Sequence, residues 1–465
     1  MNLALTSDLL SPMLVKELRQ GIKSKGFMFA FLLMQGLMVF CVLMYLTAVV
    51  SEHDASSFNT LFWFCLGATL IVITPLRAMG ALNQEIKSNT IELIFLTRLG
   101  AWRIVAGKWL ALFWQALLLT SGALPYLIFR YYFGGVNIAD DLLVLFYMLL
   151  GSAVLTAVGV CLSAFSLWLR AFVVVGVIIL SVSLIAMSVR SSLGGPFAGT
   201  PPMDLFWASV LALIRAVLIV LLAIAWGASR IAPPAENFAI WKRLLSVAII
   251  ALLAVTHIMD ETMLLLSGLV IVIPMCSDAL GELPRFIPSI YIPFARRGFF
   301  GRLAGALLYP GWPAGVFFTL ILCGIFSLIA FTGRIALNDH KIAMFAALPG
   351  ALLFPLALVL TFKPRTEKVM KGYLAFQIAF IVLTIVGGIL HDEFSSISLI
   401  PLTFFPPCAF ILNLVEQREA ADWIALTACV SVLSLSLLLI RMRPVFAKIR
   451  ELERAAAGPP QQKFQ

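Results

Sequence analysis

Charged and amide side chains interrupt the apolar sequence at 83–108, between two long apolar runs. Asn89 can cap a helix that begins at Thr90, and the Glu92 carboxylate can accept a hydrogen bond from the Asn89 backbone N–H. Gly100 can take the left-handed conformation that ends such a helix. A capped polar helix offers ion-pairing and hydrogen-bonding groups to a partner, so the chemistry that we predict here is recognition.

The predicted helix, 90–99, is short and amphipathic. Ile91, Phe95 and Leu99 follow one another at the i, i+4, i+8 spacing of a single helix face. A helix of this length cannot cross a bilayer, since a span needs about 20 residues. We therefore expect it to lie at the membrane surface, where a soluble protein can contact it.

The composition is that of an integral membrane protein. Hydrophobic residues make up 62% of the chain and charged residues 12%, far from the average of soluble domains. The net charge of +10 is explained by Lys and Arg in cytoplasmic loops, so we expect no nucleic acid as a partner. The seven cysteines stand singly without metal-ligand spacing and are interpreted as packing residues.

Apolar runs of about 20 residues divide the first half into spans. The loops between them alternate between acidic and basic, which predicts a cytoplasmic N-terminus. Before the first span, Pro12 begins an amphipathic segment in which Leu14, Leu18 and Ile22 share one face. The six predicted spans of this half are 27–50, 58–76, 106–129, 141–167, 171–189 and 205–228.

The polar stretch and its flanking spans resemble a known family. Glu85, then Thr90-Ile91-Glu92-Leu93, Thr97-Arg98-Leu99 and Trp102-Arg103-Ile104-Val105-x-Gly107-Lys108, is similar to the coupling region of ABC-2 type ABC-transporter permeases. The resemblance extends from about 11 to 168. It implies that this loop docks into an ATP-binding subunit and that the N-terminal amphipathic segment is an interfacial elbow helix. The residues it places at the interface with the ATPase subunit are Glu85, Asn89, Thr90, Glu92, Arg98 and Arg103.

The second half repeats the order and spacing of the first, which predicts a second, degenerate coupling loop at 278–303. Seven apolar runs follow in this half, but the run 397–415 contains Pro401, Pro406 and Pro407 and is interpreted as a re-entrant segment. Twelve spans then leave both termini cytoplasmic and keep more Lys and Arg on that side than thirteen spans would. The other six apolar runs of this half are 244–259, 263–277, 307–333, 342–362, 373–390 and 423–440.

We accordingly predict an all-α polytopic membrane protein with about twelve transmembrane helices in two ABC-2-like halves of six. The predicted regions are an elbow helix at 1–26, a first half at 27–229 with its coupling loop at 83–104, a linker at 230–243, a second half at 244–441 and a cytoplasmic tail at 442–465.

Arg215 lies near the middle of a predicted span, where a charge costs at least ~2.5 kcal/mol. It can contact an anionic head group or substrate in a transport pathway. The alternative is a structural hydrogen bond to polar groups such as Gln35, Gln115 or backbone carbonyls. Both interpretations place its side chain inside the helix bundle or against a wet cavity.

No phosphate-binding loop is visible in the sequence, because Gly107-Lys108 is followed by Trp109 and the glycine spacing is wrong. We therefore expect no enzyme and no cofactor in this chain, with ATP and Mg²⁺ on the partner subunit. Metal-ligand spacing is also missing from the four histidines at predicted external ends, so we expect no metal site there. These are His53, His257, His340 and His391.

The resemblance implies a permease subunit that exports its substrate by ATP-driven alternating access. It also implies a bacterial cytoplasmic membrane, with lipid and the ATP-binding subunit as partners and a homodimer or an extracytoplasmic accessory protein as further ones. Family members include permeases of multidrug, lipid, copper-enzyme-maturation and gliding systems. The alternatives are an ion-coupled secondary transporter and a non-transporting scaffold that anchors an ATPase. Acids confined to loops and helix ends count against the secondary transporter.

Overall fold

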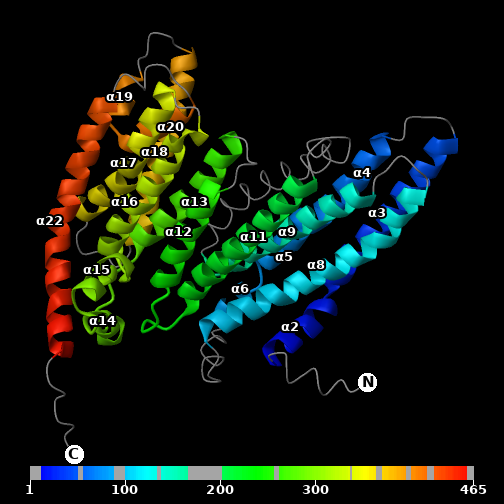
Figure 1. The fold of residues 1–465 in the computed structure, drawn as a ribbon, viewed down its shortest axis with the longest axis horizontal. Coiled ribbons are helices and arrows are strands. Elements are labelled where there is room, and N and C mark those ends of the chain that lie inside the picture. The colour runs from blue at the N-terminus through cyan, green and yellow to red at the C-terminus, as the bar shows by residue number, and fades with distance from the viewer. Residues whose placement is uncertain are drawn as a thin grey trace, which may run out of the picture. The chain divides into compact units, whose positions relative to one another are not determined.

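The computed structural model describes residues 12–50, 56–87, 100–132, 138–165, 202–255, 261–335, 338–362, 369–393, 399–415 and 424–457. Within these ranges the secondary structure is helical and contains no strand (Figure 1). The chain divides into two compact units, Met1–Ala232 and Pro233–Gln465.

Ten helices among the described residues are long and apolar enough to cross a membrane. All ten coincide with predicted spans, and they establish an all-α, multi-pass membrane protein. Of the other two predicted spans, 171–189 lies outside the described residues. The span predicted at 244–259 corresponds to α12 (Ala239–Val255), an apolar helix of 17 residues. The ten are Lys25–Thr47, Leu61–Ala78, Ala101–Phe129, Ile138–Ser163, Leu205–Ile231, Leu264–Gly281, Trp312–Thr332, Asp339–Phe362, Val369–His391 and Ile424–Arg454.

Unit 1 begins with the amphipathic helix predicted to be the elbow, and long spans follow it. The second span is one continuous helix built from three segments, with a π-helical stretch in the middle. Pro75 follows this stretch in the first turn of the last segment. Proline has no backbone N–H, and few regular helical hydrogen bonds are lost at that position. The elements are α2 (Pro12–Ile22), α3 (Lys25–Val50), α4 (Ser56–Gly67), η1 (Ala68–Ile73), α5 (Thr74–Ala78), α6 (Asn83–Lys87), α8 (Ala101–Tyr132), α9 (Ile138–Ser163) and α11 (Pro202–Ile231).

The core of unit 1 is formed by the faces that α3, α4, α8 and α9 turn toward one another. Trp63 and Leu66 of the second span are fully buried among Met34 and Met38 of α3 and Leu119 of α8. Their outward neighbours, such as Phe64, remain exposed because the surrounding solvent is expected to be lipid. Burial of one face therefore orients each helix about its axis.

Helices α5 and α9 approach closely because one residue at their crossing has no side chain. A Cβ built on Gly159 would lie 2.8 Å from the Pro75 carbonyl oxygen and 2.9 Å from the Ala78 Cβ. Two turns before Gly159 on α9, the Ser152 hydroxyl lies 3.1 Å from the Thr74 hydroxyl of α5. Small residues and a buried hydrogen bond are the usual means of joining helices in membranes.

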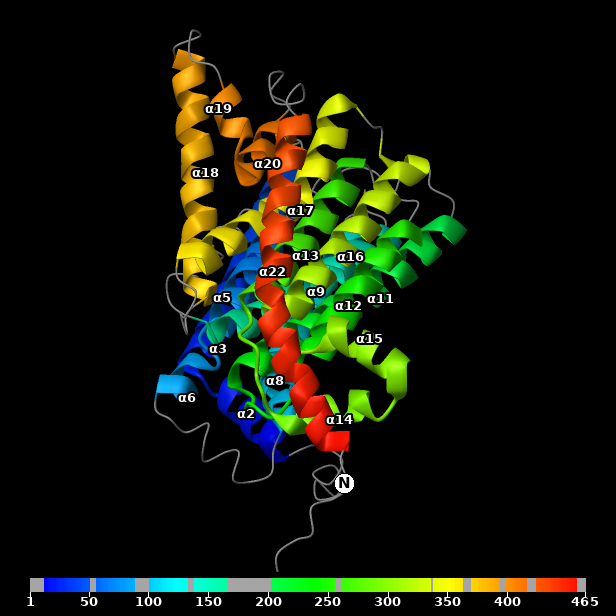
Figure 2. The same ribbon diagram turned by 90° about the vertical axis from the view of Figure 1, so that its left-hand side faces the viewer.

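In unit 2, α17 occupies the centre, and α20 and α22 pack on it (Figure 2). A Cβ on Gly350 of α17 would meet the Ser431 hydroxyl of α22, so these two helices also touch through a glycine. The elements are α12 (Ala239–Val255), α13 (Glu261–Gly281), α14 (Pro288–Ala295), α15 (Gly298–Leu308), α16 (Trp312–Ile329), η2 (Ala330–Arg334), α17 (Asp339–Phe362), α18 (Val369–Glu393), α19 (Ile400–Thr403), α20 (Pro406–Leu414) and α22 (Ile424–Ala457).

The proline-rich segment near the end of unit 2 forms two short helices, α19 and α20, neither of which could span a bilayer. The chain breaks at Phe404 and Phe405, before the Pro406-Pro407 pair that begins α20. Polar groups at the break are satisfied inside the protein, since the Thr427 hydroxyl of α22 donates to the Thr403 carbonyl at 3.0 Å. Such satisfaction is what irregular backbone inside a membrane requires.

The close contact at Gly159 predicts that Gly159→Ala lowers the stability of unit 1. The added Cβ would press on backbone atoms that cannot move aside, and overpacking of this kind costs about 1–3 kcal/mol. Gly36→Ala is the matched control, because its Cβ meets no atom within 4 Å. Thermal unfolding of the detergent-solubilised protein should show a lower midpoint for the first variant alone. Equal midpoints would contradict the α5–α9 contact.

Candidate functional site

The structure describes only some of the residues predicted to contact an ATPase subunit. Asn89, Thr90, Glu92 and Arg98 fall in 88–99, outside the described residues. The two ends of the loop are described. Glu85 lies in the short helix α6, and Arg103 is exposed in the first turn of α8.

One lysine joins the entry of this loop to two other elements. The Lys108 ammonium of α8 lies 2.8 Å from a Glu85 carboxylate oxygen in α6 and 3.2 Å from Glu17 Oε1 in α2. Its side chain is 6% exposed, so the charge is held mostly out of water. A buried ammonium requires such partners, because desolvation of an unpaired charge is costly. We call Glu17, Glu85 and Lys108 the loop-entry triad.

The turn before α6 is fixed by a second contact. The Leu82 backbone N–H donates to the Ser163 hydroxyl at the end of α9, at 3.1 Å, and the Leu82 side chain is fully buried. The hydrogen bond satisfies a buried amide that the turn leaves without a helical partner. Residues 82–85 are consequently held from both sides, by α9 and by Lys108.

A second cation, Arg77, lies at the end of the second span. Its Nη2 donates to the Gln115 carbonyl Oε1 at 3.0 Å and to the Ser24 hydroxyl at 3.3 Å. The guanidinium also stands over the Phe27 ring, with 5.6 Å from its central carbon to the ring centroid. These partners are all neutral, whereas Lys108 is paired with two carboxylates.

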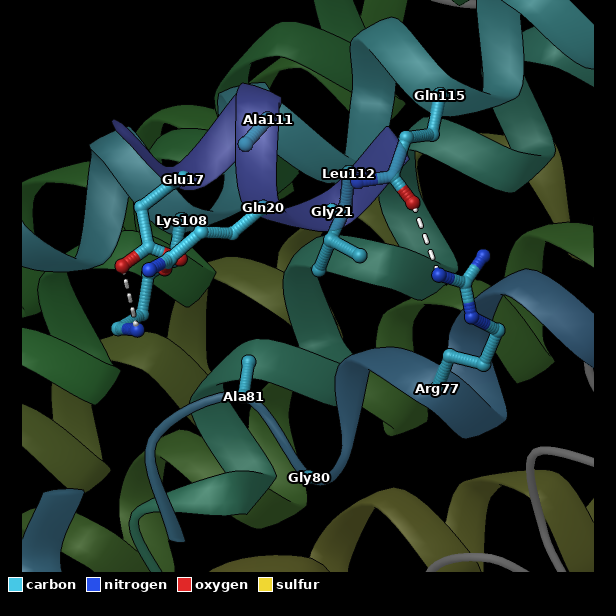
Figure 3. A pocket seen from close by; sticks show the side chains of 10 residues that line it. All are labelled: Glu17, Gln20, Gly21, Arg77, Gly80, Ala81, Lys108, Ala111, Leu112 and Gln115. Carbon is cyan, nitrogen blue, oxygen red and sulfur yellow. Dashed lines mark hydrogen bonds and ion pairs between the residues drawn. The ribbon is translucent and has the colours of Figure 1, made fainter. Parts of the chain in front are cut away.

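A cavity of about 280 Å³ lies between the two cations, bounded by α2, α8 and the turn after α5 (Figure 3). Figure 3 shows the Lys108–Glu17 pair at one end of the cavity and the Arg77–Gln115 pair at the other. A polar cavity with cations at both ends can hold water or an anion. Its lining residues are Glu17, Gln20, Gly21, Arg77, Gly80, Ala81, Lys108, Ala111, Leu112 and Gln115.

Unit 2 contains a comparable junction at the residues that echo the loop entry in sequence. Lys242 of α12 donates to Asp278 Oδ2 at 2.5 Å and to Glu282 as well. Arg243 donates to the Tyr309 carbonyl at 3.0 Å and pairs with Glu282 at 3.4 Å. Glu282 thus resembles Glu85 in forming an ion pair with a lysine. The lysine of Glu282 lies earlier in the chain, on α12, whereas the lysine of Glu85 lies later in the chain, on α8.

The charge on Lys242 is stabilised at physiological pH. Complete burial opposes it, but the carboxylates of Asp278 and Glu282 outweigh burial and raise the Lys242 pKa above its usual value. For a group whose pKa is raised on folding, the stabilisation is present below the unfolded pKa. This contribution is lost only as the pH rises above the ordinary lysine range.

The predicted second coupling loop, 278–303, is packed against the C-terminal part of α22. The Tyr309 hydroxyl donates to Glu453 Oε1 at 2.7 Å, and the Tyr291 and Tyr309 rings are 4.6 Å apart. Burial and the Glu453 carboxylate raise the Tyr309 pKa, so its hydroxyl keeps the proton that it donates. The Lys448 ammonium lies 4.3 Å from the centroid of the Phe286 ring. This loop is therefore held within its own unit.

Arg215 does not line the cavity between Arg77 and Lys108. It is half-buried on α11, two turns after Ser209, whose hydroxyl lies 3.1 Å from the Tyr147 hydroxyl of α9. The structure therefore separates it from the loop-entry residues.

Sequence reasoning missed Glu17, Arg77 and the charge pairs of Lys108 and Lys242 as parts of a site. A signal was present for Lys108, which lies inside the predicted span 106–129. Because a charge inside a span is expensive, it should have prompted a search for a partner.

The chain matches no protein-family model, no curated protein and no solved structure.

The loop-entry triad predicts that Lys108→Met destabilises unit 1 by about 1–3 kcal/mol. The loss is smaller than for a fully buried pair because Glu17 and Glu85 are each 19% exposed and partly hydrated. Neutralising both acids together with Lys108 should recover part of the loss. Thermal unfolding and hydrogen exchange of 79–87 measure the effect, and unchanged exchange would contradict an anchoring role.

The junction in unit 2 predicts a larger effect for Lys242→Met, about 3–5 kcal/mol, because Asp278 is left charged at 3% exposure. The double variant Lys242→Met/Asp278→Leu should unfold at a higher temperature than Lys242→Met alone. A double variant less stable than the single one would show that Asp278 is held mainly by other partners.

Proposed function

We propose that the chain is the membrane-spanning permease subunit of an ABC-2 type transporter, an exporter driven by a separate ATP-binding subunit. The sequence pattern of 85–108 supports this, as does the order of elements in unit 1. An interfacial helix, two spans, a polar loop and a third long span follow one another there. A bacterial cytoplasmic membrane is the location that this proposal implies.

The observation that carries the proposal is the junction at Lys108. A docking loop can drive a transporter only if force on the loop reaches the spans. The loop leaves through α6 and returns through α8, and Lys108 ties both of these to α2 through Glu85 and Glu17. Movement of 88–99 would accordingly displace three elements of unit 1 together.

In the proposed mechanism, the partner subunit holds ATP and Mg²⁺ and dimerises when ATP binds. Glu92, Arg98 and Arg103 contact that subunit, while Asn89 and Thr90 begin the docking helix. Glu85 acts indirectly, because its carboxylate positions the loop through the ion pair with Lys108. Rigid-body motion of the loop then re-orients the spans around a pathway in which Arg215 would meet substrate.

The two loops are proposed to couple unequally. The second loop, 278–303, contacts α22 through Phe286, which lies under the Lys448 ammonium, so less of it can yield to a docked partner. Helices α19 and α20 form the proposed re-entrant segment of this half, as their short lengths favour.

The proposal predicts that an ATP-binding subunit co-purifies with this chain from its native membranes in mild detergent. Glu92→Ala/Arg98→Ala should lose that subunit and its ATPase activity, because both side chains would leave the docking surface. Glu451→Ala, an exposed acid on α22, is the control and should retain the subunit. Mass spectrometry and an ATPase assay read out both results.

Three other outcomes separate the alternatives. Recovery of no ATPase with any form would reject the permease proposal and favour a secondary transporter. Recovery of an ATPase without ATP-dependent substrate flux in reconstituted vesicles would favour a scaffold. Retention of the ATPase by Glu92→Ala/Arg98→Ala would place the docking surface elsewhere.

A further inference from the structure

We propose that the cavity between Arg77 and Lys108 binds a phosphate group, supplied by the head group of an anionic lipid. The inference does not depend on the proposed transport function. It rests on the unmatched charge of Arg77, on the position of the cavity in unit 1 and on its size.

Some N–H groups of the Arg77 guanidinium make no hydrogen bond to the described residues. Its two hydrogen bonds, to Ser24 and Gln115, both come from Nη2. Nη1 and Nε have no hydrogen-bond partner among the described residues, and no described carboxylate lies within ion-pair distance of the guanidinium. The planar fork of an arginine matches the oxygens of a phosphate, so these donors suit that anion.

The other cation of the cavity is already neutralised. Lys108 faces the carboxylates of Glu17 and Glu85, which together exceed its single charge. An anion entering the cavity would therefore be drawn toward the Arg77 end, where the Gln115 carbonyl fixes the guanidinium. Gln115 is itself 2% exposed, so the group that orients the Arg77 guanidinium is buried.

The cavity lies where lipid head groups are found. Arg77 is in the last turn of the span Leu61–Ala78, and the amphipathic helix α2 forms the opposite wall. Basic pockets at the ends of spans are typical sites for anionic head groups. The volume of about 280 Å³ far exceeds the share of ~30 Å³ that one water takes in the liquid, so a larger group fits.

The test compares lipid retention by the full chain and two single variants. The purified protein is titrated in detergent with dioleoylphosphatidylglycerol or dioleoylphosphatidylcholine, and bound lipid is counted by native mass spectrometry. Wild-type protein should retain the anionic lipid preferentially. Arg77→Gln should weaken that retention about tenfold, the scale of one charge-assisted contact. Arg19→Gln removes the same charge from an exposed site on α2 outside the cavity and should change retention little.

A third variant fills the cavity and keeps the guanidinium. Ala81→Leu adds three carbons at a lining position, so it should also weaken retention of the anionic lipid. Thermal unfolding of each variant establishes that the fold is intact. Equal retention by wild type, Arg77→Gln and Ala81→Leu would overturn the proposal, and so would an equal loss in Arg19→Gln.

Inorganic phosphate distinguishes the two sources of the anion. If the site is selective for a lipid, millimolar phosphate should leave phosphatidylglycerol bound and should not raise the unfolding midpoint of lipid-free protein. Phosphate that displaces the lipid and stabilises wild type but not Arg77→Gln would support the phosphate site and overturn its assignment to lipid.

Discussion

A charge buried near the apolar layer of a membrane is costly unless the protein supplies a partner for it, and each unit contains a lysine that is paired in this way. Lys108 in unit 1 and Lys242 in unit 2 are each buried between two carboxylates. Each lysine pairs with acids that lie outside its own helix. Leaving either charge unpaired would cost free energy. The ion pairs therefore define which elements lie together more strictly than apolar packing, which lets helices slide along one another.

The two units meet this constraint with different helices. In unit 1 the lysine stands on the helix after the polar loop, and its acids come from α2 and α6. In unit 2 it stands on α12, and its acids come from one end of α13, four residues apart. The first arrangement ties the loop to elements on both sides of it. The second ties neighbouring helices together and leaves the loop to be held by α22.

The spans were predictable because hydropathy and length follow from local sequence, and ten of them lie where the sequence places them. The break near Phe404 was also predictable, since Pro401, Pro406 and Pro407 fit the first turn of a helix far better than its interior, and they begin α19 and α20. The charge pairs were not predictable. Glu17 and Lys108 are 91 positions apart, and only helix packing decides which acid a given lysine reaches. Arg77 could not be singled out from the sequence, because its neutral partners and the cavity beside it exist only in the folded chain.

Helix α22 is much longer than a bilayer is thick. Its 34 residues extend about 51 Å at ~1.5 Å per residue, whereas the hydrocarbon core measures ~30 Å. The excess is the part that carries Lys448 and Glu453 to Phe286 and Tyr309. A change of tilt displaces the far end of a long helix more than its middle, and tilt responds to bilayer thickness. A thicker or thinner membrane would therefore shift α14 and α15 through their contacts with α22, although neither helix is a candidate span.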